Sequence, residues 1–254
     1  MAEVVTYAVE RGVAWVTIDR EDARNALSAA VRAGLRSGFE RFAGDDDAQV
    51  LVLTGSGTEA FSAGGDLKEM ATMALGPPPP DFFTHLNRDL ELAKPVVAAV
   101  NGVAYGGGFL LAQMCDLVVA ADTARFGITE ARWGRGAPWA APLPWMIPPR
   151  VALELMMTAE PISAARAYEV GLVNRVVPAT SLREVTQELA ERIAGNAPLS
   201  VRAAKAMVYA AAEVGWSAGL DRATEIWDPV YRSNDAQEGP RAFAERRRPR
   251  WTAT

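Results

Sequence analysis

The sequence predicts an α/β protein with a strand-rich amino-terminal part and a helical carboxy-terminal part. Two observations support this prediction. Short apolar runs rich in β-branched residues, such as Val50–Thr54 and Val96–Val100, alternate with segments of helical composition. From about Val151 onward helical composition dominates, and only Leu172–Val177 is predicted as a strand. The alternation of strands and helices implies crossover connections around a parallel-type sheet.

The first elements are a hairpin and a capped helix. Val4–Val9 and Val13–Asp19 are separated by Glu-Arg-Gly, a spacing typical of a β-hairpin. Ser28 stands where its hydroxyl can cap a helix over Ala29–Phe42. A buried strand follows, and the turn Ala63-Gly64-Gly65-Asp66 then opens a second helix.

The middle of the chain contains two irregular segments. Gly76 and Pro77–Pro80 exclude regular structure, so we expect a surface loop or a mobile lid before a helix over Asp81–Ala93. Arg132–Pro149 is rich in Trp, Gly and Pro, which predicts a loop and a broken helix over a pocket. The other elements expected are a strand at Val96–Val100, a helix at Phe109–Cys115, a strand at Leu117–Ala120, and helices at Ala152–Met157, Ser163–Val170, Ser181–Ala194, Leu199–Ala212, Trp216–Tyr231 and Ala236–Arg247.

The composition narrows the class of protein. The chain has 254 residues, 50% of them hydrophobic, which is enough for one large domain or a domain with a helical appendage. A formal net charge of -5 argues against a nucleic-acid partner, because neutralising phosphates requires a basic surface. A single cysteine excludes a disulfide within the chain, and with a single histidine it argues against a metal site. No signal-peptide pattern or long apolar span is present, so we expect a cytoplasmic protein without a membrane partner.

Two glycine turns are the first candidates for a functional site. Ala63-Gly64-Gly65-Asp66 and Gly106-Gly107-Gly108 each follow an apolar strand and precede a helix. If the strands are neighbours, two backbone N–H groups can converge on one oxygen, which is the geometry of an oxyanion hole. The simpler interpretation is that the glycines only permit tight turns.

Four motifs in this order resemble those of one superfamily. FSAGGDLKEM, NGVAYGGGFLLAQMCD, ARFGITEARWG and AYEVGLVNRVVP occur at spacings similar to those of the crotonase superfamily, the enoyl-CoA hydratase/isomerase family. The resemblance covers nearly the whole chain. It implies the crotonase fold, with a core of repeated ββα units and the acyl-CoA site over residues 1–195, and a helical region over residues 196–254 used in trimerisation. It also implies a homo-oligomer, either a trimer or a dimer of trimers.

The resemblance implies an acyl-CoA thioester as substrate. Members of the family stabilise the enolate of such a thioester, and the two amides that do so correspond to Gly65 and Gly107. One preorganised donor is worth about 3 kcal/mol in acyl-transfer enzymes, so two donors can make an enolate accessible. Coenzyme A is part of the substrate, and no separate cofactor is expected.

The carboxylates of the family bear on the reaction type. Its hydratases use two glutamates, and the corresponding positions here are Leu110 and Glu130, with Thr129 in place of the usual proline before the second. Addition of water requires one group that activates the water and one that transfers the proton at the α-carbon, and leucine can do neither. Moving a double bond requires one base, so this pair resembles the Δ3,Δ2-enoyl-CoA isomerases. We interpret Glu130 as catalytic, with an apolar wall including Leu110 that raises its pKa. The simpler interpretation is a carboxylate satisfied at a helix amino terminus.

Other functions stay open on the sequence alone. An enoyl-CoA hydratase is one alternative, in which another acid or a bound water replaces the missing glutamate. Resemblance of the carboxy-terminal part to carnitinyl-CoA dehydratases keeps dehydration of a hydroxyacyl-CoA in view. A non-catalytic acyl-CoA binding protein is a third alternative, although the intact glycine turns and Glu130 argue against it.

The resemblance also assigns residues to the coenzyme A part of the substrate. These residues are Ala63, Gly64, Arg24, Lys68, Phe243 and Arg246. Ala63 and Gly64 offer backbone groups to the adenine end of coenzyme A. Arg24, in ARNAL, and Lys68, in DLKEM, are candidates for binding its phosphates. Phe243 and Arg246 match an aromatic and a basic residue that reach the coenzyme A of a neighbouring subunit in related hydratases. The simpler interpretation of each basic residue is a solvated surface charge.

The segment after Glu130 offers candidates for the acyl pocket. Trp133, Trp139 and Trp145 fit either an acyl pocket or core packing. Arg132 and Arg135 favour a polar or carboxylated acyl group if they lie beside that pocket.

Three further residues are assigned to structure. Asp116, in the MCD motif, is expected to be structural, and Cys115 beside it a small buried hydrophobe. His85 has no motif around it, so we expect it at the surface or in helix packing.

Overall fold

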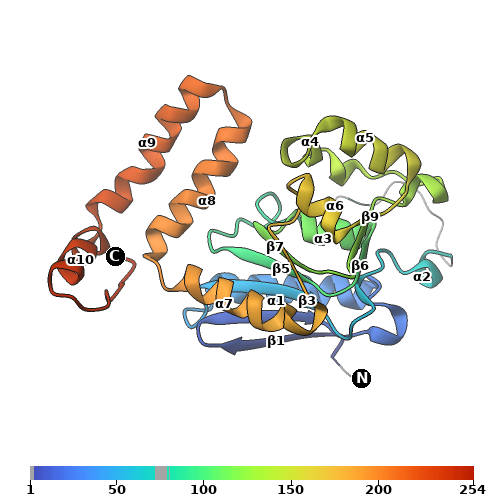
Figure 1. Cartoon of the computed structure of the whole chain (residues 1–254), viewed down its shortest axis with the longest axis horizontal. Helices are drawn as coiled ribbons and strands as arrows, with labels where there is room; N and C mark the ends of the chain where they lie inside the picture. Colours follow the sequence, from blue (N-terminus) through green and yellow to red (C-terminus); the bar gives the residue numbers. More distant parts are fainter. Residues whose placement is uncertain (1–2, 72–78, 80) are drawn as a thin grey trace.

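The computed structural model describes residues 3–71, 79 and 81–254, and its core is a six-stranded sheet of strand order β1-β2-β3-β5-β7-β10 (Figure 1). The strands are β1 (Val5–Glu10), β2 (Val13–Ile18), β3 (Val50–Gly55), β5 (Val96–Val100), β7 (Leu117–Ala121) and β10 (Arg175–Val177). β1 and β2 pair antiparallel as the predicted hairpin, and every other neighbouring pair is parallel. The predicted parallel-type sheet is therefore confirmed.

Helices cover both faces of this sheet. Successive side chains of a strand point to opposite faces, so Trp15 and Val16 of β2 identify the two layers. The Trp15 indole N–H donates to Gln187 of α7 (Leu182–Ala194), at 2.6 Å, whereas Val16 packs beside Gly38 of α1 (Ala29–Gly44). The strands between these helices are buried on both faces, which explains why they are almost wholly apolar.

A second, four-stranded sheet completes the ββα units. It has the order β4-β6-β8-β9, formed by β4 (Ala60–Ser62), β6 (Val103–Tyr105), β8 (Arg125–Gly127) and β9 (Ile162–Ser163). In two successive units, β3-β4-α2 and β5-β6-α3, the first strand joins the large sheet and the second joins the small sheet. The helices of these units are α2 (Leu67–Ala71) and α3 (Gly107–Gln113). This arrangement confirms the crotonase fold class.

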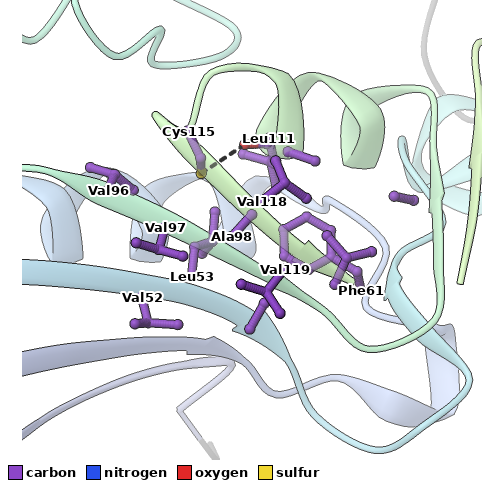
Figure 2. Close-up of a cluster of buried hydrophobic side chains, with 14 of the residues drawn as sticks. Val52, Leu53, Phe61, Val96, Val97, Ala98, Leu111, Cys115, Val118 and Val119 are labelled. Carbon is purple, nitrogen blue, oxygen red and sulfur yellow. Dashed lines mark hydrogen bonds between the residues drawn. The ribbon is translucent and has the colours of Figure 1, made fainter. Parts of the chain in front are cut away.

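The hydrophobic core lies where α3 and β4 meet the large sheet. Figure 2 shows side chains of β3, β5 and β7, among them Val52, Val97 and Val119, beside Leu111 and Cys115. The Cys115 thiol is buried and donates to the Leu111 carbonyl (3.2 Å), and burial raises the pKa of this thiol well above its usual range. As predicted, Cys115 is a small buried core residue.

The helix predicted over Asp81–Ala93 was wrong. Turns occupy this segment, and Leu86 and Leu90 form an isolated β-bridge. Asn87 adopts a left-handed conformation (φ 64°), which an α-helix cannot include, and its N–H donates to the Leu90 carbonyl (2.9 Å). The loop or lid predicted for Gly76 and Pro77–Pro80 lies outside the described residues, apart from Pro79.

The remaining helices form two groups. Figure 1 shows α8 and α9 projecting from the sheets and α10 at the end of this arm. α9 contains no buried residue, and Trp216, Leu220 and Tyr231 expose large apolar surfaces. The helices concerned are α4 (Leu143–Met146), α5 (Pro149–Thr158) and α6 (Ala164–Glu169) beside the small sheet, and α8 (Pro198–Glu213), α9 (Trp216–Arg232) and α10 (Asn234–Ala244) in the arm.

Asp116 attaches this arm to the core. Its carboxylate accepts hydrogen bonds from the Val96 N–H (2.7 Å) and the Tyr209 hydroxyl (2.9 Å), and it pairs with Lys205 (2.9 Å). The Lys205 and Asp116 side chains are only 8% and 14% exposed. Since Tyr209 and Lys205 belong to α8, one buried carboxylate joins a core strand to the arm, as expected of a structural residue.

Replacing Asp116 by asparagine is expected to lower the free energy of unfolding by about 2–3 kcal/mol, because Lys205 loses its buried counter-ion. Urea titration at fixed protein concentration would measure the change. Asp228→Asn is the control, since Asp228 pairs with Arg232 on the exposed surface of α9 and such pairs contribute at most about 1 kcal/mol. Equal losses in the two variants would contradict the anchoring role.

Candidate functional site

The two glycine turns lie side by side. β4 and β6 pair in parallel, so the segments that follow them, Ala63–Gly65 and Gly106–Gly108, emerge at the same edge of the small sheet. A Cβ on Gly64 would lie 2.6 Å from the Tyr105 carbonyl oxygen and 3.2 Å from the Gly107 nitrogen. With a φ of 91° as well, Gly64 can be replaced by no other residue without strain.

A third segment holds the first turn in place. The Ala63 N–H donates to the Arg24 carbonyl (3.0 Å), and the Leu27 N–H donates to the Gly64 carbonyl (2.8 Å). Ser62 accepts from the Gly64 N–H through its hydroxyl (3.2 Å) and donates to the Asn25 carbonyl (2.8 Å). The segment around Arg24 is therefore adjacent to Ala63 and Gly64, as their common assignment to one ligand requires.

The turns open into a cavity of about 640 Å³. Its described lining combines small residues of both turns with a largely apolar wall: Ala63, Gly64, Gly65, Leu67, Met70, Ala71, Pro79, Phe82, Phe83, His85, Arg88, Gly106, Gly107, Thr129, Glu130, Trp133, Arg135, Gly136, Pro138 and Trp139. Gly107 is the first residue of α3, so its N–H has no acceptor within the helix. Gly65 and Gly107 thus line the same cavity, as an oxyanion hole requires.

Glu130 lies beside the second glycine turn in the wall of this cavity. It begins the 3₁₀ helix Glu130–Trp133, and a Cβ on Gly106 would lie 3.1 Å from its Oε1. Its Oε2 is buried, with no hydrogen-bond partner among the described residues. Burial raises the pKa of Glu130, and hydrogen bonds from the N–H groups of Glu130 and Thr129 offset only part of this effect. The amides at the start of this 3₁₀ helix thus satisfy part of the carboxylate, while Oε2 has no partner among the described residues.

The other site residues predicted from sequence are absent from the described cavity lining. Leu110 is 2% exposed inside α3, one turn after Gly106, whose carbonyl accepts from the Leu110 N–H (3.0 Å). Lys68 is exposed on α2, next to the lining residue Leu67. Phe243 (87% exposed) belongs to α10 and Arg246 follows this helix, which lies at the far side of the molecule from α2 in Figure 1. Within one chain they are therefore remote from the cavity.

The segment after Glu130 forms the broken structure expected over a pocket. Trp133 and Trp139 line the cavity, whereas exposed Trp145 is absent from its described lining. Gln113 of α3, which the sequence did not single out, donates to the Trp139 carbonyl (2.9 Å). The Trp139 ring also packs on Phe109, with centroids 6.0 Å apart. α3 therefore positions both the second glycine turn and the aromatic wall.

The wall opposite this segment was missed by sequence reasoning. Phe82, Phe83 and His85 line the cavity, and a Cβ on Gly107 would lie 3.2 Å from the Phe83 ring. No signal in the sequence identified them, because the segment was interpreted as a helix. Among the described residues, no cluster of His, Cys, Asp or Glu is suited to hold a metal ion. Within the same ranges, no helix combines the length and apolar composition needed to cross a membrane.

Comparison with known proteins identifies the family. The profile described as enoyl-CoA hydratase/isomerase matches residues 8–254. The chain is similar to the carnitinyl-CoA dehydratase of Salmonella typhi, with 38% identity over 246 residues and coverage of 93% of each protein. It is also similar to the carnitinyl-CoA dehydratase of Proteus mirabilis strain HI4320, with 36% identity and 99% coverage of both.

Solved structures agree with the sequence relatives. The chain superposes on an enoyl-CoA hydratase from Mycobacterium tuberculosis H37Rv with a TM-score of 0.90 and 37% identity, covering 100% of both chains. An enoyl-CoA hydratase from Bacillus anthracis gives a TM-score of 0.89 and 33% identity, covering 99% of this chain and 100% of the other. The similarity thus includes the helical arm as well as the two sheets.

Proposed function

The chain belongs to the enoyl-CoA hydratase/isomerase family, and on this premise we propose that it moves a double bond within an acyl-CoA thioester through a proton shuttle on Glu130. The thioester oxygen is held by the N–H groups of Gly65 and Gly107, which line the same cavity as Glu130. As a proton leaves the carbon next to the thioester, negative charge moves onto this oxygen. Two donors placed there in advance stabilise the developing charge, and each is worth about 3 kcal/mol.

One observation carries the isomerase assignment: Glu130 is the single carboxylate in the described lining of the cavity. Residues 72–78 and 80, which the structure does not describe, contain no Asp or Glu. An isomerisation needs only this group, since the carboxylate takes a proton from one carbon of the enoyl chain and the resulting carboxylic acid returns it to another. No water is added, and the charge held on the thioester oxygen is released in the second step.

The remainder of the substrate is assigned to residues around the first turn. We assign the adenine end of coenzyme A to backbone groups of Ala63 and Gly64, and its phosphates to Arg24 and Lys68. Because α10 is remote from the cavity of its own chain, Phe243 and Arg246 would act on a neighbouring subunit. This assignment requires a homo-oligomer, a trimer or a dimer of trimers, and the exposed apolar side chains of α9 support assembly through residues 196–254. Coenzyme A enters with the substrate, and no separate cofactor is assigned.

Hydration or dehydration is the second candidate. It is favoured by the relatives named above, since two of them are named carnitinyl-CoA dehydratase and the two solved structures are named enoyl-CoA hydratase. In this case a bound water, placed by groups other than a second glutamate, would have to supply the missing acid–base function. A purely acyl-CoA binding protein is less consistent with the buried, unpartnered oxygen of Glu130.

The product formed in heavy water distinguishes these functions. The purified protein is incubated with a medium-chain 3-enoyl-CoA, and products are identified by mass spectrometry and by the absorbance of the conjugated thioester. A 2-enoyl-CoA without added water supports the isomerase. In a parallel incubation that starts from the matching 2-enoyl-CoA, a 3-hydroxyacyl-CoA formed while the 3-enoyl-CoA stays unchanged would instead establish hydration, and thioester binding without deuterium incorporation would establish a binding protein.

The pH dependence of catalysis tests the role of Glu130. A base must be ionised, and burial raises the pKa of this carboxyl, so kcat/KM is expected to fall on acidification with a midpoint above the usual glutamate value of about 4.3. The folded state also holds the proton more tightly than the unfolded state, so this group lowers stability as pH rises between its two pKa values. Rates measured between pH 4 and 8 on the same thioester would give the midpoint. A midpoint at or below about 4.3 would exclude a buried base.

A further inference from the structure

Gln113 replaces a hydrogen bond that the short helix carrying Trp139 cannot form. In the 3₁₀ helix Pro138–Ala140, the Trp139 carbonyl would accept from the residue three positions later, but this residue is Pro142, which has no N–H. The Gln113 Nε2 lies 2.9 Å from this carbonyl oxygen and donates to it. Since Gln113 is the last residue of α3, its amide joins the short helix to α3.

Two side chains of α3 hold Trp139. Phe109 and Gln113 are four residues apart, which places them on the same face of the helix. Phe109 packs on the Trp139 ring, with centroids 6.0 Å apart, while Gln113 holds the carbonyl. The ring and the backbone of this cavity-lining tryptophan are therefore both fixed to the helix that begins with Gly107.

The fold alone does not explain why a glutamine occupies this position. Gln113 is 5% exposed, and its Oε1 is buried with no hydrogen-bond partner among the described residues. Reversing the amide would not remedy this, because the Trp139 carbonyl can only accept. A buried acceptor without a partner lowers stability, and a methionine of similar length would avoid that loss. Departures of this kind from the best choice for stability are typical of residues that serve a functional site.

The distance along α3 relates Gln113 to the acyl group. Gln113 lies six residues after Gly107, which corresponds to about 9 Å along the helix. A thioester whose oxygen is held at Gly107 has its first acyl carbons beside Glu130 and its later carbons toward the wall that contains Trp139. A four-carbon acyl group is too short to span this distance, whereas an extended eight-carbon group spans it. An indole ring offers a large apolar surface to such a chain.

We propose that Trp139 forms the subsite for the distal carbons of an apolar, medium-chain acyl group, and that Gln113 is the positioning residue that holds this subsite in place. This inference rests on the proposed function in one respect, namely that an acyl-CoA thioester occupies the cavity. Gln113 is absent from the described lining, so it acts on the substrate through Trp139. It takes no part in proton transfer.

Two saturated thioesters of different length test this assignment without requiring turnover. Isothermal calorimetry on the full-length protein gives the dissociation constants of butyryl-CoA and octanoyl-CoA. The wild-type protein is expected to bind octanoyl-CoA at least about tenfold more tightly, because more apolar surface is buried. Gln113→Met should weaken octanoyl-CoA binding by about fivefold or more and change butyryl-CoA binding less than about twofold, since only the longer chain reaches Trp139.

Gln187→Met is the matched control. Gln187 is also 5% exposed and contacts a tryptophan, but it lies on α7 and is absent from the described lining. Its Oε1 accepts from the Trp15 indole N–H (2.6 Å), and its Nε2 donates to the Glu10 carbonyl (3.2 Å). Methionine there leaves both groups unpaired, so the midpoint of urea unfolding should fall while the preference for octanoyl-CoA stays at its wild-type value. Gln113→Met should show the opposite pattern, with a midpoint equal to or above that of wild type.

A double variant tests whether Gln113 acts through Trp139. Trp139→Leu removes the ring and should weaken octanoyl-CoA binding at least as much as Gln113→Met does. Adding Gln113→Met to this variant should then change octanoyl-CoA binding less than about twofold, because the group that Gln113 positions is already gone.

Several outcomes would overturn the assignment. A wild-type protein that binds both thioesters equally would refute the subsite directly. Equal weakening of both thioesters by Gln113→Met, or additive losses in the double variant, would mean that Gln113 does not act through Trp139. A lower unfolding midpoint with an unchanged preference would make Gln113 a structural residue only. If the selective loss is found but no unsaturated thioester is converted, the proposed catalytic function fails while the assignment of Gln113 and Trp139 stands.

Discussion

Replacing Glu130 by glutamine is expected to lower the rate of proton exchange at the α-carbon of a bound acyl-CoA by roughly 10²- to 10⁴-fold, the usual contribution of a positioned acid–base group. Glutamine preserves the volume of the side chain but cannot accept the proton. The glycine turns are unchanged, so acyl-CoA binding should persist. Deuterium incorporation from heavy water measures the exchange, and calorimetry with a saturated thioester measures the binding.

Glu160→Gln provides the control for this variant. Glu160 is 73% exposed and pairs with Arg132, so its replacement removes a carboxylate from the same region without altering the described lining of the cavity. Its exchange rate should stay within about twofold of wild type, since surface ion pairs contribute little. If Glu130→Gln retained most of the wild-type exchange, another base would have to be sought.

The Gly108→Ala variant is expected to lose about 3 kcal/mol or more of stability, because an added methyl group has no space. A Cβ on Gly108 would overlap the Ser62 carbonyl oxygen and lie 2.9 Å from the carbonyl carbon. Both belong to the backbone, so no rotamer change can relieve the overlap. Because the Ser62 hydroxyl also accepts from the Gly64 N–H, a shift of Ser62 should move the first glycine turn and reduce catalysis as well.

Gly44→Ala separates this packing effect from the general effect of adding a methyl group to a helix. Gly44 ends α1, and a Cβ there would have no heavy atom within 4 Å. Alanine should leave the midpoint of urea unfolding unchanged or raise it slightly, because glycine is the poorer helix former. If Gly108→Ala were as stable as Gly44→Ala, α3 and β4 would have to separate more easily than their close contact implies.

The sequence predicted the large sheet more completely than the small one, for a physical reason. Strands such as Val96–Val100 are five or six residues long and buried on both faces, so they appear as continuous apolar runs. The small sheet is built from strands of two or three residues, for example Ile162–Ser163, which are too short for any periodicity to be visible. Their positions follow from pairing between distant segments and from the ββα order.

The candidate site shows the same division. The glycine turns and Glu130 could be predicted because small residues and carboxylates mark their chemistry in the sequence itself. The wall formed by Phe82 and Phe83 could not, since the turn at Asn87 depends on a left-handed conformation that the composition does not reveal. Only the structure shows that Arg135 lines the cavity and that Arg132 does not, because a loop has no periodicity from which the direction of a side chain could be predicted.

The single thiol of the chain reports on motion of the core. Cys115 is buried behind α3, and only the thiolate form of a cysteine reacts quickly with alkylating reagents. Cys115 can therefore react with such a reagent only when α3 separates from the sheet, so the rate of alkylation reports how often this local opening occurs. Because α3 also begins with Gly107, a thioester bound at that turn should lower the rate of alkylation in proportion to its occupancy.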